Sequence, residues 1–430
     1  MKYDFTTIMD RCGKDALAVD ALGQGWAPAK PREGFDPIPM WVADMNFPTA
    51  PAVTRAMTER ISHPCFGYFD PREEYFDAII RWQTTRNGVV GLEKKHIGYE
   101  NGVLGGILSA LGTFCSRGDN VLLNSPVYMG FMGSLTNAGY HIVESPLVLD
   151  ENGVWRLDLA DMERKITENR IRAALFCSPH NPTGRVWERW EIEAVMELYR
   201  KHDVYVVSDE IWSDIILSGN KHIPTQSVSE DARMRTVAQY ATTKTFSLAG
   251  LVGSYHIIYN DRLRDRVEKE SSLSHYNNMN VLSMYALIGG YSDEGAEWVD
   301  ELNQVINETL SVSGSMLVKI FTREEKEYEK FVKVNKEATD YIRTHFKGVT
   351  AAYPQGTYMI FMDCAEWLET HGKTLPELVK MGHDVGVAWQ DGTGHGGTTH
   401  IRLNVALPLE RVKEAFGRMD AYVFNGGANR

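Results

Sequence analysis

The sequence predicts an α/β fold in which a large domain holds a mostly parallel, doubly wound sheet and a smaller α+β domain is built from both chain ends. Two observations predict this fold. The chain has 430 residues, more than one small core needs, and from about residue 100 to 260 short apolar runs alternate with amphipathic ones. Such alternation is typical of a parallel sheet. We expect the large domain to span residues 49–292 and the small one to combine 1–48 with 293–430.

The elements follow in order along the chain. Residues 1–48 are rich in Gly, Pro and Trp, which predicts an extended arm. Pro51 and the spacing of Val53, Met57 and Ile61 predict a short helix after it. Apolar runs predict the strands of the large sheet at 120–124, 141–144, 172–178, 204–210, 236–241 and 254–259. Helical spacing of apolar residues predicts a helix at 188–202, between two of these strands.

After about residue 292 the pattern becomes helical and charged. Glutamates and lysines crowd residues 322–347, which predicts a helix with a solvated face. Apolar runs predict the strands of the small domain at 349–352, 358–363, 386–389 and 400–405.

Composition excludes several classes of protein. The formal net charge of −12 argues against a nucleic-acid partner or an anionic membrane surface. The five cysteines are scattered, which argues against disulfides and a zinc ribbon. The first residues lack an apolar signal region, and no apolar run is long enough to span a bilayer. We therefore expect a soluble cytoplasmic protein.

Four predicted strands lead to side chains of different chemistry. These are the Tyr128 ring, the Asn181 amide, the Asp209 carboxylate and the Lys244 amine. Ligands of open α/β sheets bind beyond the carboxyl ends of the strands, so we expect the four to converge there. Lys244 lies between two β-rich runs, where desolvation would lower its pKa and let it form a Schiff base with a carbonyl cofactor.

This set of side chains suits pyridoxal phosphate (PLP). A carboxylate keeps the pyridine nitrogen protonated, an amide donates to the phenolic oxygen, and an aromatic ring stacks on the pyridine face. The phosphate requires backbone N–H groups at a helix N-terminus. The small residues of segment 101–106, which open an apolar helical run, supply such a turn.

Three motifs, in this order, carry a family resemblance: Asn181-Pro182-Thr183-Gly184, Ser208-Asp209-Glu210 and Lys244-Thr245-Phe246. The chain resembles the class I/II aminotransferase-fold (fold type I) PLP enzymes, and among them the cystathionine β-lyase-like C–S lyase branch. The resemblance extends over nearly the whole chain through segments 39–45, 66–68, 101–103, 125–128, 354–358 and 402–404.

The resemblance implies a role for each matching residue. Lys244 would be the Schiff-base lysine and the acid/base at the substrate Cα. The other implied cofactor ligands are Asp209 at the pyridinium, Asn181 at the phenolic oxygen, Tyr128 on the ring, Trp212 beside it, and Gly102, Val103, Leu104, Thr242 and Thr243 at the phosphate. Tyr68 would reach the phosphate of a neighbouring subunit, which implies a homodimer. Arg402 would bind the substrate carboxylate bidentately, with Ala43, Asp44 and Tyr358 beside the substrate.

The chain departs from the family pattern in three places. Trp212 stands where many aminotransferases have a tyrosine and the lyase branch a histidine, and an indole cannot exchange a proton. Val252 stands where classical aminotransferases have a phosphate-binding arginine, which the lyase branch also lacks. The segment 308–330 is longer than the usual linker to the second domain.

Each candidate also has a structural interpretation. Asp209 could cap a helix, Asn181 could be a turn residue, Tyr128 and Tyr68 could be packing aromatics, and Arg402 could pair with a surface acid. His395 and His400 lie in a Gly-rich loop without a third ligand nearby, so we expect a solvated or gating loop and no metal site.

We expect β-elimination on L-cystathionine or another cysteine S-conjugate, which gives pyruvate, ammonia and a thiol. Trp41, Trp212 and Tyr358 would suit a thioether side chain if they line the pocket. Transamination of an L-amino acid starts from the same chemistry and is the alternative. A regulatory protein on the same fold is the third hypothesis, which the lack of a basic extension disfavours.

Overall fold

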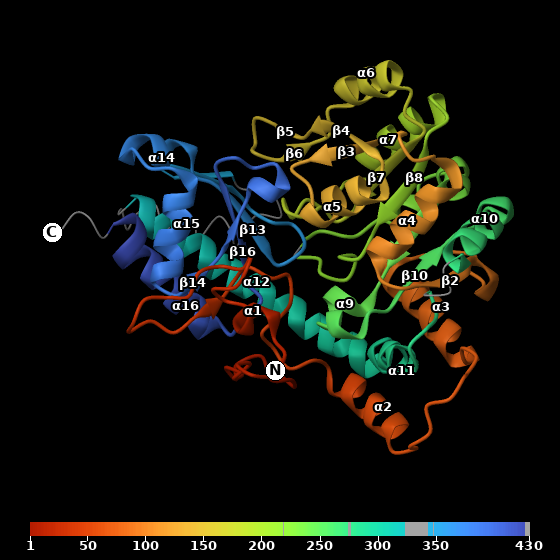
Figure 1. The fold of residues 1–430 in the computed structure, drawn as a ribbon, viewed down its shortest axis with the longest axis horizontal. Helices are drawn as coiled ribbons and strands as arrows, with labels where there is room; N and C mark the ends of the chain where they lie inside the picture. Colours follow the sequence, from red (N-terminus) through yellow and green to blue (C-terminus); the bar gives the residue numbers. More distant parts are fainter. Residues whose placement is uncertain (218, 274–276, 323–342, 347, 426–430) are drawn as a thin grey trace.

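The computed structural model describes residues 1–217, 219–273, 277–322, 343–346 and 348–425. Figure 1 shows a seven-stranded sheet with its helices on the right and a five-stranded sheet with α14, α15 and α16 on the left. The long helix α12 (Asp293–Thr322) runs between the two parts. No helix in these ranges is long and apolar enough to cross a membrane.

The large sheet has the strand order β2-β10-β9-β8-β7-β3-β4. Its strands are β2 (Ile97–Glu100), β3 (Asn120–Ser125), β4 (His141–Pro146), β7 (Ala173–Cys177), β8 (Tyr205–Asp209), β9 (Thr236–Tyr240) and β10 (Ser254–Ile257). Only β10 pairs antiparallel to its neighbours, so the prediction of a mostly parallel sheet is confirmed. Every residue of β7 and β9 is buried, as in a sheet covered on both faces.

Helices cover the two faces of this sheet separately. Leu123 and Leu175 face a core shared with α4 (Val103–Phe114), α5 (Met129–Ala138) and α10 (Asp261–Ser272). Leu122 and Ala174 face a second core, shared with α6 (Leu159–Asn169), α7 (Arg189–Lys201) and α8 (Glu230–Arg235). Neighbouring residues of one strand thus point to opposite cores, which is the doubly wound arrangement.

The small sheet is antiparallel, with the order β11-β12-β13-β16-β15. Its strands are β11 (Arg343–Phe346), β12 (Val349–Ala352), β13 (Met359–Asp363), β15 (Gln390–Asp391) and β16 (His400–Asn404). Helices α14 (Ala365–His371), α15 (Leu375–Asp384) and α16 (Leu409–Arg418) accompany it. The charged helix predicted for 322–347 falls largely outside the described residues. Its last part is wrong, because 343–346 form β11, which pairs with β12.

The N-terminal arm joins the small part of the molecule through a strand pair. β1 (Ile38–Pro39) pairs in parallel with β14 (Val387–Ala388). Before β1, the arm holds one short helix, α1 (Leu17–Asp20). Strand β14, predicted for the small domain, therefore binds the arm instead of joining the five-stranded sheet. The domain boundaries at 48 and 292 stay predictions.

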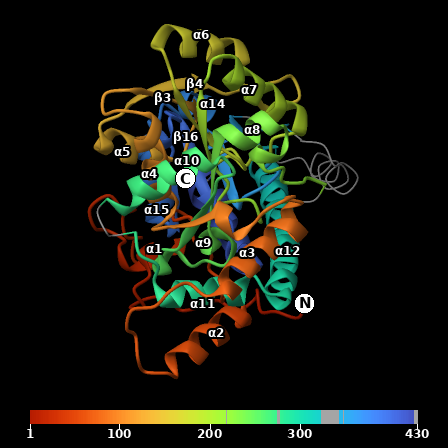
Figure 2. The same ribbon diagram turned by 90° about the vertical axis from the view of Figure 1, so that its right-hand side faces the viewer.

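The arm continues into helices that lie below the large sheet in Figure 1. These are α2 (Pro51–Ile61), α3 (Glu73–Asn87) and, later in the chain, α11 (Val281–Gly290). A Cβ on Gly289 would lie 2.5 Å from the Ala52 carbonyl oxygen, so α2 and α11 pack closely through a glycine. The segment 62–72 joins α2 to α3 with every residue exposed, and Figure 2 draws it at the outer edge of the molecule.

Candidate active site

The carboxyl ends of β7, β8 and β9 bring three of the predicted residues to one edge of the sheet. Asp209 is the last residue of β8, Asn181 follows β7, and Lys244 lies in the short helix α9 (Thr242–Thr245) after β9. The hydrogen bonding between β7 and β8 continues one residue past β7, because Ser178 N donates to Asp209 O at 2.9 Å. The two strand ends are therefore held together at the edge where a ligand would bind.

Lys244 is half-buried, and its amine has a polar partner. Its Nζ donates to the carbonyl oxygen of Ala43 at 2.7 Å and lies 5.6 Å from the centre of the Trp212 ring. Burial, together with the positive charge of Arg402, lowers the Lys244 pKa to about 8, against the opposing charges of Asp44 and Asp209. At mildly alkaline pH a large share of this amine is neutral and can act as a nucleophile or base.

Asp209 is a buried carboxyl group, 4% exposed. Its Oδ1 accepts a hydrogen bond from Ile211 N at 3.0 Å. Burial raises the Asp209 pKa to about 7, although that bond and the charge of Lys244 favour the ionised form. A protonated ring nitrogen beside Asp209 would return the group to its carboxylate form.

Arg402 and Asn181 form a pair between the two parts of the molecule. Arg402 Nη1 donates to Asn181 Oδ1 at 3.3 Å, and its Nη2 donates to Trp41 O at 2.9 Å. Arg402 Nε has no partner among the described residues. Burial lowers the Arg402 pKa to about 10, which still leaves the group charged at neutral pH. Because Asn181 uses its oxygen here, its NH2 group remains the donor toward a ligand.

The segment 42–46 lies against this edge and is tied down by polar contacts. Asn404 Nδ2 donates to the carbonyl oxygens of Val42 and Asp44, at 2.7 and 2.5 Å. Asp44 forms an ion pair with Arg11 at 2.7 Å. Because its carboxylate is neutralised by this arginine, Asp44 is less available to bind the substrate than we predicted. Neither Arg11 nor the role of Asn404 was found from the sequence, although Asn404 lies in a motif that carried the resemblance.

The three aromatic residues predicted for the pocket have different positions. Tyr358 is fully buried, donates to Ala43 O at 3.2 Å, and packs edge-on against Trp212 with ring centres 4.7 Å apart. Both therefore lie beside Lys244. The Trp41 indole instead donates to Ala18 O at 2.9 Å and packs with Leu22 of the arm. The Trp41 ring therefore packs against the arm.

The start of α4 forms an anion-binding turn. Gly102 precedes the helix with φ +82°, a left-handed conformation that favours glycine. No side chain caps this end, so the first backbone N–H groups of α4, from Val103 and Leu104, point outward. Val252 lies alongside, since a Cβ on Gly102 would be 3.9 Å from its Cγ1. Thr242 and Thr243 begin α9 after β9, the first buried and the second half-buried.

Comparisons with known proteins identify the family. A model of aminotransferase class I and II matches residues 37–419. The chain belongs to this family. Cystathionine beta-lyase PatB of Bacillus subtilis (strain 168) is 32% identical over 422 residues, which cover 97% of this chain and 99% of that protein. Aspartate aminotransferase of Geobacillus stearothermophilus is 25% identical over 313 residues, or 71% of this chain and 70% of the relative. The PLP-bound C–S lyase from Staphylococcus hominis superposes with a TM-score of 0.82 at 26% identity, covering 98% and 99% of the two chains.

These findings confirm the predicted family, its fold and PLP as its cofactor. The residues of this aminotransferase-family enzyme also fit PLP. Asp209 is a buried carboxyl group that suits a cationic ring nitrogen, and Lys244 is an amine with a lowered pKa for the aldehyde. The uncapped start of α4 suits the phosphate. The individual roles of these residues remain proposals.

Tyr128 and Tyr68 are placed very differently. Tyr128 immediately precedes α5. Burial raises the pKa of its hydroxyl, and the charges of Arg402 and Asp209 act on it in opposite directions, so the half-buried ring lies near both. Tyr68 is fully exposed in the segment 62–72. Within one chain, the structure therefore brings Tyr128 to the edge of the sheet and leaves Tyr68 in solvent.

The loop between β15 and β16, which we expected to be solvated or gating, exposes Thr393 and Thr398 but buries His395. A gating role stays a prediction. His395 is 1% exposed, so it is not solvated, because the loop packs against the segment before α5 through a bond from Val127 N to His395 O at 2.9 Å. Within the described ranges, no three His, Cys, Asp or Glu side chains are grouped to hold a metal ion.

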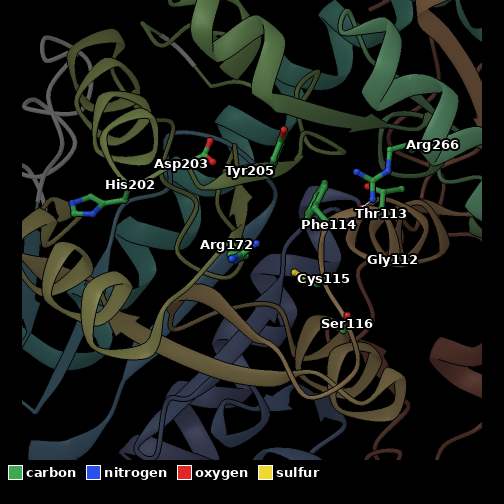
Figure 3. Close-up of a pocket in the computed structure, with 10 residues that line it drawn as sticks. All are labelled: Gly112, Thr113, Phe114, Cys115, Ser116, Arg172, His202, Asp203, Tyr205 and Arg266. Atoms are coloured by element: carbon green, nitrogen blue, oxygen red, sulfur yellow. Dashed lines mark hydrogen bonds between the residues drawn. The ribbon is translucent and has the colours of Figure 1, made fainter.

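A separate cavity of about 550 Å³ lies at the opposite edge of the large sheet. Figure 3 shows Arg172 and Cys115 near its middle, with His202 and Arg266 at its two sides. Apart from Arg266 of α10, its lining residues precede or begin β3, β7 and β8, whereas Asp209 and Lys244 lie at the carboxyl ends of β8 and β9. Burial raises the pKa of Cys115 to about 12, so its thiol stays protonated and is a poor nucleophile.

Proposed function

We propose that this enzyme is a PLP-dependent C–S β-lyase acting on L-cystathionine or another cysteine S-conjugate, giving pyruvate, ammonia and a thiol. The observation that carries PLP chemistry is the half-buried Lys244 amine, with its pKa lowered to about 8, at one sheet edge with Asp209 and Arg402. The choice of a lyase is supported by the sequence identity, which is higher to cystathionine beta-lyase than to aspartate aminotransferase.

Each residue would have one task in this reaction. Bound PLP withdraws electrons from the substrate Cα, which makes the Cα proton acidic. Lys244 Nζ takes that proton, and Ala43 O orients the amine through the 2.7 Å bond. Arg402 binds the substrate carboxylate and fixes the direction of the Cα–H bond. Arg402 stays bound to Asn181 and Trp41 O, which hold its guanidinium in place.

The cofactor would be held by residues from three strand ends. Asp209 keeps the ring nitrogen protonated, Asn181 donates to the phenolic oxygen, and Tyr128 stacks on the ring. The phosphate is bound by the N–H groups at the start of α4 and by hydroxyls of α9, namely through Gly102, Val103, Leu104, Thr242 and Thr243. Trp212 contacts Lys244 and Tyr358 and supplies an apolar wall without exchanging a proton.

The active form would be a homodimer. Tyr68 is fully exposed, and all residues of 61–74 are exposed, Phe66 to 55%. Exposed aromatic residues on an extended segment suit a protein partner. A second copy would place Tyr68 at the phosphate of the neighbouring site. A cytoplasmic location also stays a prediction.

Release of pyruvate tests the reaction. The holoenzyme is incubated with L-cystathionine and no added 2-oxo acid, and pyruvate is followed with lactate dehydrogenase. Stoichiometric pyruvate and thiol support the lyase. Amino transfer to an added 2-oxo acid without pyruvate would instead support the aminotransferase, the alternative that the similarity to aspartate aminotransferase favours. Partner binding that is unaffected in an inactive Lys244→Ala variant would revive the regulatory hypothesis.

A further inference from the structure

His395 is held at the junction between the small sheet and the large one. It ends a short 3-10 segment, Thr393–His395, in the loop between β15 and β16. Its carbonyl oxygen accepts from Val127 N at 2.9 Å. A Cβ on Gly394 would lie 3.4 Å from Met129 Cε, so the loop packs along the residues on both sides of Tyr128. The position of His395 is therefore fixed relative to the candidate active site.

The imidazole of His395 is buried but unsatisfied. It is 1% exposed, and neither ring nitrogen meets a hydrogen-bond partner within the described part of the chain. The Phe361 ring lies beside it, with centres 6.3 Å apart. Buried polar groups in folded proteins nearly always have a partner. A ring with two unsatisfied nitrogens next to a binding site therefore points to a ligand.

Arg402 defines the charge that this ligand must carry. In the sheet, Arg402 lies opposite both Phe361 and Gln390, so the three side chains share one face. Burial lowers the pKa of His395 well below its usual value, and the positive charge of Arg402 lowers it further. The imidazole is thus neutral and offers one N–H donor. Arg402 Nε is a second unsatisfied donor. An imidazole N–H beside a guanidinium whose own Nε–H is unsatisfied suits an anion and disfavours a metal cation.

We infer that His395 is a further substrate-binding residue, whose ring N–H donates a hydrogen bond to the α-carboxylate that Arg402 holds. The inference rests on the proposed function only in placing the carboxylate at Arg402. Binding of the α-carboxylate by both His395 and Arg402 would restrict the substrates to compounds with a free α-carboxylate. Amines, and esters or amides of amino acids, would be rejected. Sequence reasoning assigned His395 no such role, since its burial depends on contacts with a distant segment.

A pair of matched ligands tests this role in the holoenzyme. L-norleucine has no leaving group at Cβ, and 1-aminopentane is the same molecule without the carboxylate. Their dissociation constants are measured from the cofactor absorbance for the wild type, His395→Phe and His395→Gln. We expect His395→Phe to weaken norleucine binding about tenfold or more, the loss of one hydrogen bond to a charged acceptor. Binding of 1-aminopentane changes less than about twofold, and His395→Gln, which keeps a donor, stays within about threefold of the wild type for norleucine.

His400→Phe is the matched control. His400 lies in β16 and stacks on Phe361, the ring that also lies beside His395, with ring centres 4.4 Å apart. Its charged neighbour is Asp363. This variant should bind both ligands as the wild type does. Equal weakening of both ligands in His395→Phe, or no weakening of norleucine, would overturn the inference.

A second measurement follows His395 in the wild-type protein itself. The wild type is labelled with 15N-histidine, and NMR follows the ring nitrogen signals of His395. These signals are assigned by their loss in His395→Gln or another variant that folds. They should shift when norleucine binds and not when 1-aminopentane does. Signals that shift equally with both ligands would contradict the inference. Both readouts measure binding, so absence of pyruvate from cystathionine would refute the lyase proposal without affecting this one.

Discussion

Lys244 Nζ and the carbonyl oxygen of Ala43 are joined by a 2.7 Å hydrogen bond, although the two residues lie 201 positions apart. The same oxygen accepts from the Tyr358 hydroxyl at 3.2 Å. The Ala43 carbonyl of the arm therefore orients Lys244, which follows β9, and also binds Tyr358, which immediately precedes β13. The candidate site requires the arm and both sheets together.

Asp209 should make the stability of the cofactor-free protein fall with rising pH. In the unfolded chain an aspartate loses its proton near pH 4, whereas burial raises the pKa of Asp209 to about 7 in the fold. The folded state thus binds more protons between these values, and stability declines as pH rises through them. Asp209→Asn removes this titration, so only the wild type loses stability in this way. The free energy of unfolding of the variant minus that of the wild type should therefore be about 2 to 3 kcal/mol larger at pH 8 than at pH 5.

Urea unfolding of the two cofactor-free proteins at both pH values measures this difference. Asp203→Asn is the control, because the side chain of Asp203 is 91% exposed. A stability difference between Asp209→Asn and the wild type that is the same at pH 5 and pH 8 would show that burial does not raise this pKa.

Arg402→Lys should weaken substrate binding while the chain still folds. Lysine keeps the positive charge but cannot bind a carboxylate through two parallel N–H groups, nor reach both Asn181 and Trp41 O. We expect KM for the substrate to rise about 10- to 100-fold. Steady-state kinetics measure the change, with Arg411→Lys in α16, where the arginine pairs with Asp36 and Glu414, as control. An unchanged KM would place the carboxylate elsewhere.

Tyr68→Ala should lower the affinity for PLP, and the defect should be complemented between subunits. If Tyr68 serves the neighbouring site, a mixed dimer of Tyr68→Ala with Lys244→Ala has one site free of both changes. Activity at limiting PLP should then exceed the sum of the two separate variants. It is measured after the two proteins are unfolded and refolded together. No recovery, although mixed dimers are shown to form, would mean that Tyr68 does not act across a dimer.

Gly102→Ala should affect both the fold and the cofactor. Its φ of +82° strains any residue with a Cβ, at a cost of about 1 kcal/mol in the free energy of unfolding. Gly91 has a φ of +72° and open space around it, so Gly91→Ala should cost a similar amount. Only Gly102→Ala should also weaken PLP binding, measured by fluorescence titration. Equal PLP affinity in both variants would exclude the start of α4 as the phosphate site.

Local patterns predicted the sheet and its edge well. Asn181, Asp209 and Lys244 follow apolar runs, and parallel strands that end at one edge bring such residues together. The contacts that complete the site could not be predicted, because they join distant segments without a local signal. Arg11 with Asp44, the arm over Trp41, and the loop that buries His395 are of this kind. The charge pattern that predicted a helix over 322–347 also failed at 343–346, where pairing with β12 decides the structure.

Covalent labelling tests the central claim most directly. The holoenzyme is reduced with sodium borohydride, which fixes PLP to the amine that holds it, and the protein is digested and analysed by mass spectrometry. The account predicts one modified peptide, with the label on Lys244, and no label in Lys244→Ala, while Lys413→Ala on α16 is labelled as the wild type is. A label on any other lysine, or full labelling of Lys244→Ala, would contradict it.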